Sequence, residues 1–86
     1  MVWKIWSDDT VSIKAGELIA PTANNWVMYE DENIRTINYS LVWKKPMIAI
    51  VVRTNTNEGG VLVAKIVTSN GQFGWIPATF AKKIVQ

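Results

Sequence analysis

The chain has 86 residues, the length of one small domain, and 49% of them are hydrophobic. It contains neither cysteine nor histidine, which excludes disulfides, thiolate or imidazole metal sites and the usual histidine-based nucleophiles. The net charge is only +2, too little to indicate nucleic-acid binding by itself. We therefore expect a single folded domain over residues 1–86, with no cofactor and no bound metal.

The N-terminal stretch does not resemble a secretory signal peptide, because Asp8 and Asp9 interrupt its apolar residues. No apolar run approaches the roughly 18 residues that a membrane span needs. We expect a protein that is not exported by a signal peptide and has no membrane partner.

The first third of the chain predicts short strands separated by turns. Trp3 to Trp6 predicts an opening strand, and Ser7 to Thr10 has turn-forming residues. Leu18 and Ile19 begin another strand, which Pro21 ends, and Trp26 to Tyr29 is a further short apolar run.

The middle third predicts two longer strands of different character. From residue 37 onward, four large apolar residues occupy every second position and predict a half-buried antiparallel strand: Ile37, Tyr39, Leu41 and Trp43. Met47 to Val52 is apolar at every position, which predicts a central strand covered on both faces. Thr54 to Gly60 is polar and glycine-rich and predicts a long hairpin loop.

The last third predicts a hairpin. Asn70-Gly71 follows the apolar run Val61 to Val67, and this dipeptide favours a type I′ turn because both residues tolerate positive φ. Pro77 cannot donate to a strand ladder, so the second strand should end near it. Ala78 to Phe80 predicts one 3₁₀ turn before a last strand, Lys82 to Val85.

Short strands with turn signals every 8 to 12 residues or so are typical of small barrels and sandwiches. We expect an all-β fold: a small barrel of five to seven short antiparallel strands with one 3₁₀ turn near Ala78–Phe80.

Two segments resemble a known family. Gly71 to Phe80 reads Gly, then Gly-aromatic-aliphatic-Pro, two small residues and an aromatic, as at the end of an SH3-like (Src homology 3) barrel. Thr10 to Glu17 resembles the diverging turn of the same family. The resemblance implies an SH3-like barrel and, by analogy with its peptide-binding members, a groove that includes Pro77 and Phe80.

The order of motifs is also similar to that of short, free-standing SH3-like proteins encoded by tailed phages of marine bacteria, cyanophages among them. The matching segments are Gly16 to Ile19, Ile48 to Val52, Ser69 to Gly71, Trp75 and Ile84-Val85. This resemblance implies a phage-encoded accessory protein, either a small structural component of the virion or an adaptor for a host protein. It implies a location in the virion or the host cytoplasm.

Five tryptophans are many for a chain of this length. Trp3, Trp43 and Trp75 lie in apolar strand patterns, so we expect them in the core. Trp6 and Trp26 adjoin polar turn segments, and we expect them to be exposed contacts, since tryptophan is a frequent interface anchor.

No pattern indicates catalysis. The acids at Asp8, Asp9 and Glu30 to Glu32 are sequence neighbours rather than a separated acid/base pair, and they are too few for a calcium loop. We expect a non-catalytic protein–protein interaction module that binds a protein partner or symmetry mates, including a homo-oligomer, and no small-molecule substrate. The expected contact residues are Trp6, Trp26, Tyr29, Asn57, Glu58, Pro77 and Phe80.

The alternative is a nucleic-acid-binding β-barrel. Aromatic stacking would come from Trp43 or Tyr39. Phosphate contacts would come from four basic residues: Lys44, Lys45, Arg53 and Lys65.

Overall fold

A single antiparallel sheet organises the described part of the chain. A computed structural model describes residues 13–84. In this range the elements are β1 (Leu18–Pro21), β2 (Asn25–Tyr29), β3 (Ile37–Lys44), β4 (Ala49–Thr56), β5 (Leu62–Thr68), β6 (Phe73–Pro77), the 3₁₀ helix η1 (Ala78–Phe80) and β7 (Ala81–Lys83). The strand order is β3-β2-β6-β5-β4-β1-β7. The prediction of an all-β fold with five to seven antiparallel strands and a 3₁₀ turn at Ala78–Phe80 is therefore confirmed.

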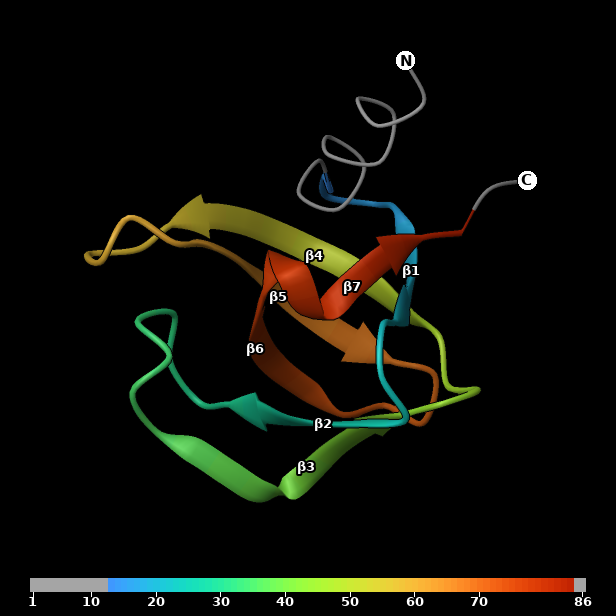
Figure 1. Cartoon of the computed structure of the whole chain (residues 1–86). Coiled ribbons are helices and arrows are strands. Elements are labelled where there is room, and N and C mark those ends of the chain that lie inside the picture. The colour runs from blue at the N-terminus through green and yellow to red at the C-terminus, as the bar shows by residue number, and fades with distance from the viewer. Residues whose placement is uncertain (1–12, 85–86) are drawn as a thin grey trace.

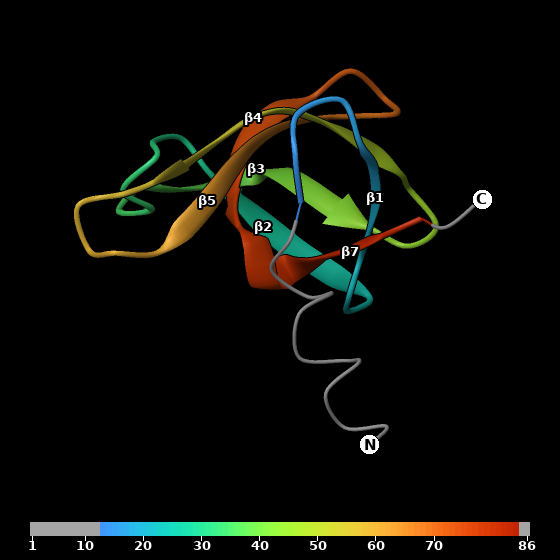
Figure 2. The same ribbon diagram turned by 90° about the horizontal axis from the view of Figure 1, so that it is seen from above.

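The sheet curls over but is not closed into the small barrel that the sequence predicts. In the described part of the chain, β3 and β7 are the two ends of the sheet and do not pair with each other. Figure 1 shows β4 and β5 above β2 and β3, with β6 connecting the two layers. Seen from above, β2 and β3 lie beneath the upper layer (Figure 2). The core therefore lies between two halves of one curled sheet.

The core side chains come from both layers. Val51 and Ile66 point inward from the upper layer, Met28 and Trp43 from the lower layer, and Ile19 from β1, all essentially inaccessible to solvent. This matches the alternation of Cβ atoms along each strand.

Two of the three tryptophans expected in the core are described, Trp43 and Trp75, and both are buried. The indole N–H of Trp43 donates to the carbonyl of Met47 over 2.9 Å, so its polar group is satisfied. The prediction is confirmed for these two residues. Trp3 lies outside the described residues.

The β5–β6 hairpin forms where expected, but its turn is of another type. Gly71 has φ of 88°, whereas Asn70 does not have a positive φ. The N–H of Gly71 donates to Thr68 O over 2.8 Å, and Thr68 N–H donates to Gln72 O over 2.9 Å. This is a three-residue loop, a turn followed by a left-handed glycine, so the type I′ prediction is wrong.

The β4–β5 hairpin repeats this geometry. Gly60 has φ of 80° and its N–H donates to Asn57 O over 3.0 Å, while Asn57 N–H donates to Val61 O over 2.9 Å. Because β4 continues to Thr56, the long loop expected over residues 54–60 is reduced to a tight turn.

Strand β3 departs from simple alternation. Its register with β2 shifts between Val27, which opposes Val42, and Met28, which opposes Asn38. The intervening residues 39–41 therefore have no partner on β2, and Tyr39 is 76% exposed. Tyr39 does not share the buried face of Trp43, because a bulge resets the phase of a strand.

Strand β4 is covered on one face only, so the prediction of a strand covered on both faces is wrong. Ala49 and Val51 are buried, but Ile48, Ile50 and Val52 are 39%, 44% and 42% exposed. A run that is apolar at every position has no polarity contrast between its faces, so its pattern could not distinguish the two cases.

Several expectations lie at the ends of the chain. The opening strand from Trp3 to Trp6, with Asp8 and Asp9, lies outside the described residues. The last strand was expected over Lys82 to Val85 and is observed at Ala81–Lys83. Val85 lies outside the described residues. In residues 13–84, no helix has the length and apolar character needed to cross a membrane.

Candidate interaction surface

An apolar row crosses four neighbouring strands. Leu18 of β1 opposes Ile50 of β4, Ile50 opposes Val67 of β5, and Val67 opposes Phe73 of β6. Directly opposed residues point to the same face of a sheet. Ile48 and Val52 flank Ile50 on this face. We call these six residues the open face: Leu18, Ile48, Ile50, Val52, Val67 and Phe73.

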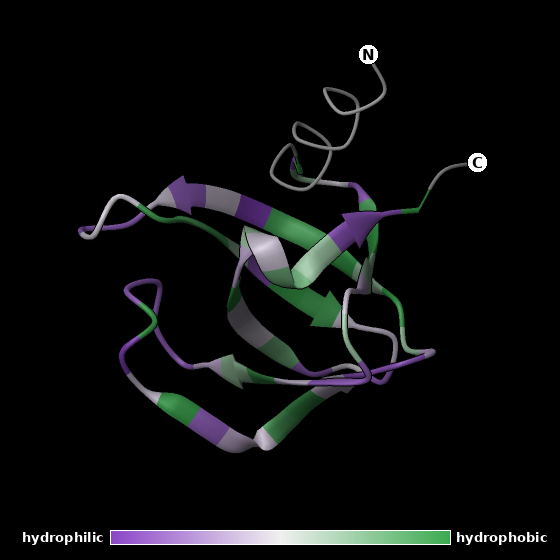
Figure 3. Ribbon diagram, viewed as in Figure 1, coloured by the Kyte–Doolittle hydropathy of each residue, from purple (hydrophilic) through white to green (hydrophobic). Residues whose placement is uncertain are grey.

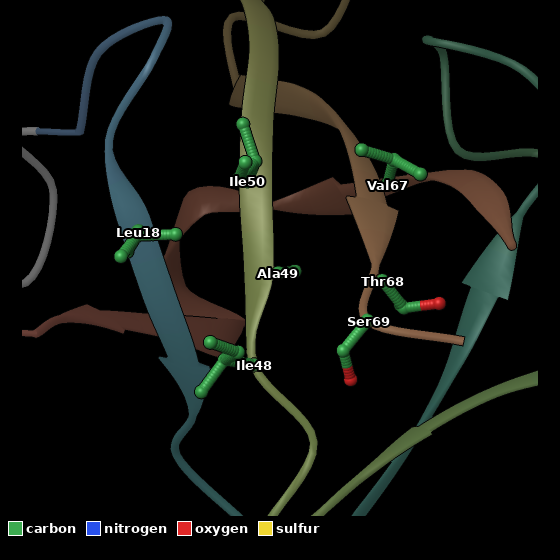
Figure 4. Close-up of a pocket in the computed structure, with 7 residues that line it drawn as sticks. All are labelled: Leu18, Ile48, Ala49, Ile50, Val67, Thr68 and Ser69. Carbon is green, nitrogen blue, oxygen red and sulfur yellow. The ribbon is translucent and has the colours of Figure 1, made fainter. Parts of the chain in front are cut away.

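The open face is accessible to solvent. Phe73 is 56% exposed and Leu18 and Val67 are half-buried. Figure 4 shows Leu18, Ile50 and Val67 side by side on adjacent strands, and these residues help to line a shallow hollow of about 190 Å³. Figure 3 shows that apolar residues gather on the part of β4 and β5 next to β1, whereas the end of β4 at the hairpin tip is hydrophilic.

Basic side chains border the Phe73 end of the row. Arg53 opposes Lys65 across β4 and β5, and Lys65 opposes Trp75 across β5 and β6. The guanidinium carbon of Arg53 lies 5.2 Å from the ring centroid of Trp75, and the ammonium of Lys65 lies 5.8 Å from that of Phe73. A bulge at Val52 makes this arrangement possible, because Val52 and Arg53 are both exposed there.

A second hollow, of about 250 Å³, adjoins this basic end. Tyr29 lies on its wall and opposes Trp75 across β2 and β6. The wall also includes Lys65, Phe73 and one carboxylate, that of Glu30. The aliphatic part of the open face is therefore continuous with an aromatic and basic surface at its Phe73 end.

The structure brings together three of the residues expected to bind a partner. The rings of Trp26 and Phe80 stack with centroids 3.7 Å apart and planes 10° from parallel. Pro77 immediately precedes η1, which contains Phe80. The indole N–H of Trp26 donates to Thr22 Oγ1 over 3.3 Å. Trp26 and Phe80 are half-buried and pack against the core, so they stabilise the fold as well as presenting an edge to solvent.

Two other expected contact residues, Asn57 and Glu58, lie at the tip of the β4–β5 hairpin. Asn57 is only 8% exposed. Its Oδ1 accepts from the N–H groups of Gly59 (2.9 Å) and Val61 (3.0 Å), and its Nδ2 donates to Glu32 O over 3.2 Å. Asn57 thus joins the hairpin to the segment between β2 and β3 and has little surface left for a partner.

Glu58 forms an exposed ion pair with Arg35, at 2.7 Å. Trp6, the remaining expected contact, lies outside the described residues.

The four basic residues of the nucleic-acid alternative divide into two pairs. Arg53 and Lys65 oppose each other, but Lys44 and Lys45 lie at the end of β3, and β2 and β6 intervene between β3 and β5 in the sheet. Of the two stacking candidates, Trp43 is fully buried and Tyr39 is exposed.

None of the six residues of the open face was among the expected contacts. Their residue types are those of the core, and nothing in their local pattern marks them as exposed. The signal that identifies them is the strand order, which opposes four of them across the sheet.

In residues 13–84, no cluster of three or more acidic side chains could hold a metal ion. In comparisons with known proteins, no family model, no curated protein and no solved structure matches this chain.

Proposed function

We propose that this protein is a non-catalytic protein–protein interaction module that binds its partner through the open face. The observation that carries the proposal is the opposed row Leu18–Ile50–Val67–Phe73, flanked by exposed Ile48 and Val52. Contiguous exposed apolar surface is costly for a free monomer and marks contact sites in small proteins.

The biological setting follows from the sequence resemblance. Its motifs support a phage-encoded accessory protein, a small virion component or a host-protein adaptor, located in the virion or the host cytoplasm. Either role needs a binding surface and no catalytic residues. Repeated copies in a virion would also supply a partner of fixed geometry.

Nucleic-acid binding is the second candidate, favoured by one observation: the Arg53–Lys65 pair beside exposed Phe73. It has less support, because Lys44, the last residue of β3, and the adjacent Lys45 lie apart from this pair. The two candidates differ in salt dependence, since phosphate contacts weaken steeply with salt and apolar contacts do not.

The test compares two variants of equal exposure. Ile48, on the open face, and Val61, at the hairpin tip, are both 39% exposed. The tagged protein and its Ile48→Lys and Val61→Lys variants are used to capture partners from lysate of the producing cells, with nuclease and at high salt. We expect one stoichiometric protein with wild type and Val61→Lys, and its loss with Ile48→Lys.

Capture that is unchanged by Ile48→Lys would overturn the assignment of the open face. Recovery of nucleic acid alone, lost at high salt or after nuclease treatment, would instead establish the second candidate. Matching melting temperatures of the two variants would show that the difference is not a folding defect.

A further inference from the structure

We infer that the partner segment on the open face combines apolar side chains with carboxylates, and that the carboxylates lie against Arg53 and Lys65. This inference rests on the proposed function and specifies the chemistry of the partner. The distribution of charge around the apolar row supports it.

The charged residues around the row differ in whether they form ion pairs. At the Leu18 end, the neighbouring Glu17 and Lys83 pair with each other at 3.6 Å. At the Phe73 end, neither Arg53 nor Lys65 forms an ion pair with any residue of the described chain. Among the described residues, Glu30 is the one acid on the wall of the adjoining hollow, and it is exposed to solvent. The open face therefore has unpaired cations at its Phe73 end, and a further exposed lysine, Lys82, opposes Ala20 of β1 near Leu18.

The two cations lie close to the apolar surface rather than extending away from it. Arg53 lies over the ring of Trp75 and Lys65 over that of Phe73, at distances typical of cation–π contacts. These contacts restrict the long side chains, so a partner carboxylate would meet groups that are already positioned. The guanidinium of Arg53 suits a carboxylate because it can donate two parallel hydrogen bonds.

The row itself favours a polypeptide. Four opposed strands span roughly 14 Å, from three strand spacings of about 4.8 Å, and the side chains of Leu18, Ile50 and Val67 are aliphatic. Single-stranded nucleic acid binds on aromatic platforms, and within this row only Phe73 provides a ring. A second copy bound through the same face would bring a second set of these cations to the interface, and among the described residues only Glu30 adds a carboxylate on the wall of the adjoining hollow.

The experiment is a selection of displayed random peptides on the immobilised full chain, with counter-selection on its Ile50→Lys variant. We expect enriched peptides that combine Ile, Leu, Val or Phe with Asp or Glu. One such peptide is then synthesised, and its affinity is measured for wild type, Lys65→Glu and Lys44→Glu. The last variant is the matched control, because it makes the same change of charge at an exposed lysine on β3.

We expect Lys65→Glu to weaken binding at least tenfold and Lys44→Glu less than twofold. A peptide with lysines in place of its carboxylates should bind Lys65→Glu better than wild type. Equal effects of the two variants, or no enrichment of acidic residues, would overturn this inference while leaving the proposed function intact. A selection that yields no Ile50-dependent peptide would overturn both.

Three controls report other occupants, and a positive result in any of them overturns the inference. A salt-sensitive complex with oligothymidylate that is lost in Lys65→Glu would indicate nucleic acid. A dimer in light scattering that is lost in Ile50→Lys would indicate a second copy. The third control is a variant that combines Asp8→Asn and Asp9→Asn. If it binds the peptide tenfold more tightly than wild type, residues 1–12 of the chain occupy the surface.

Discussion

Gly71 is a residue at which backbone conformation alone sets the effect of a substitution on stability. Its φ of 88° lies in the region that side chains other than hydrogen disfavour, and a Cβ added there would meet no heavy atom within 4 Å. A substitution at Gly71 therefore lowers the free energy of unfolding through backbone strain and not through a steric clash. Gly59, in the equivalent loop of the β4–β5 hairpin, has no such φ, and an added Cβ would meet only Asn57 Oδ1 at 3.5 Å.

We predict that Gly71→Ala lowers the free energy of unfolding by about 1 kcal/mol or more, whereas Gly59→Ala changes it by less than about 0.5 kcal/mol. Chemical denaturation of both variants measures the difference. Equal effects would contradict the assignment of strain to Gly71.

Trp26 shows how a surface aromatic can be structural. We expected it to be an exposed contact, but it stacks on Phe80 and packs against the core. We predict that Trp26→Ala lowers the free energy of unfolding by about 2 kcal/mol or more, because the stack and its apolar burial are lost. Tyr39→Ala, at an aromatic that is 76% exposed, should change it by less than about 0.5 kcal/mol. Thermal melts compare the two, and similar losses would argue against the stacked arrangement.

At the scale of elements, the β4–β5 hairpin is joined to the segment between β2 and β3 by hydrogen bonds and an ion pair. The buried Asn57 side chain donates one hydrogen bond to Glu32 O of that segment and accepts two within the hairpin. Asn55 and the N–H of Glu58 add exposed hydrogen bonds to Glu32 and Asn33, and the Glu58 carboxylate pairs with Arg35 at the exposed surface. Removing a partner of buried polar groups leaves them unsatisfied, whereas an exposed ion pair contributes little.

We predict that Asn57→Ala lowers the free energy of unfolding by about 1–3 kcal/mol and speeds amide hydrogen exchange at Gly59 and Val61. Glu58→Gln should cost less than about 1 kcal/mol. If the order of the two effects were reversed, the surface ion pair rather than Asn57 would be the main connection.

At the scale of the whole molecule, the curled sheet has a covered face and an open one, and β4 has side chains on both. Val51 points into the core and its neighbour Val52 is 42% exposed. We predict that Val51→Thr lowers the free energy of unfolding by about 1–3 kcal/mol, because it buries a hydroxyl, while Val52→Thr changes it by less than about 0.5 kcal/mol. The two substitutions are identical and adjacent, so equal losses in denaturant melts would show that the outer face is covered as well.

Much of the fold could be predicted from local patterns. The turn at Asn70-Gly71, the end of β6 at Pro77 and the 3₁₀ turn at Ala78–Phe80 follow from backbone restrictions of glycine and proline, which act within a few residues. The type of hairpin turn and the bulge in β3 could not be predicted in this way, because both depend on how two strands align.

The sequence by itself determined the all-β class, the positions of most strands and the burial of Trp43 and Trp75. Only the tertiary structure decided which face of Met47 to Val52 is covered, and it joined Ile50 to residues distant in the chain. The physical reason is that burial depends on which strands lie alongside and what covers them. A run that is apolar at every position has the same local pattern whether one of its faces is covered or both.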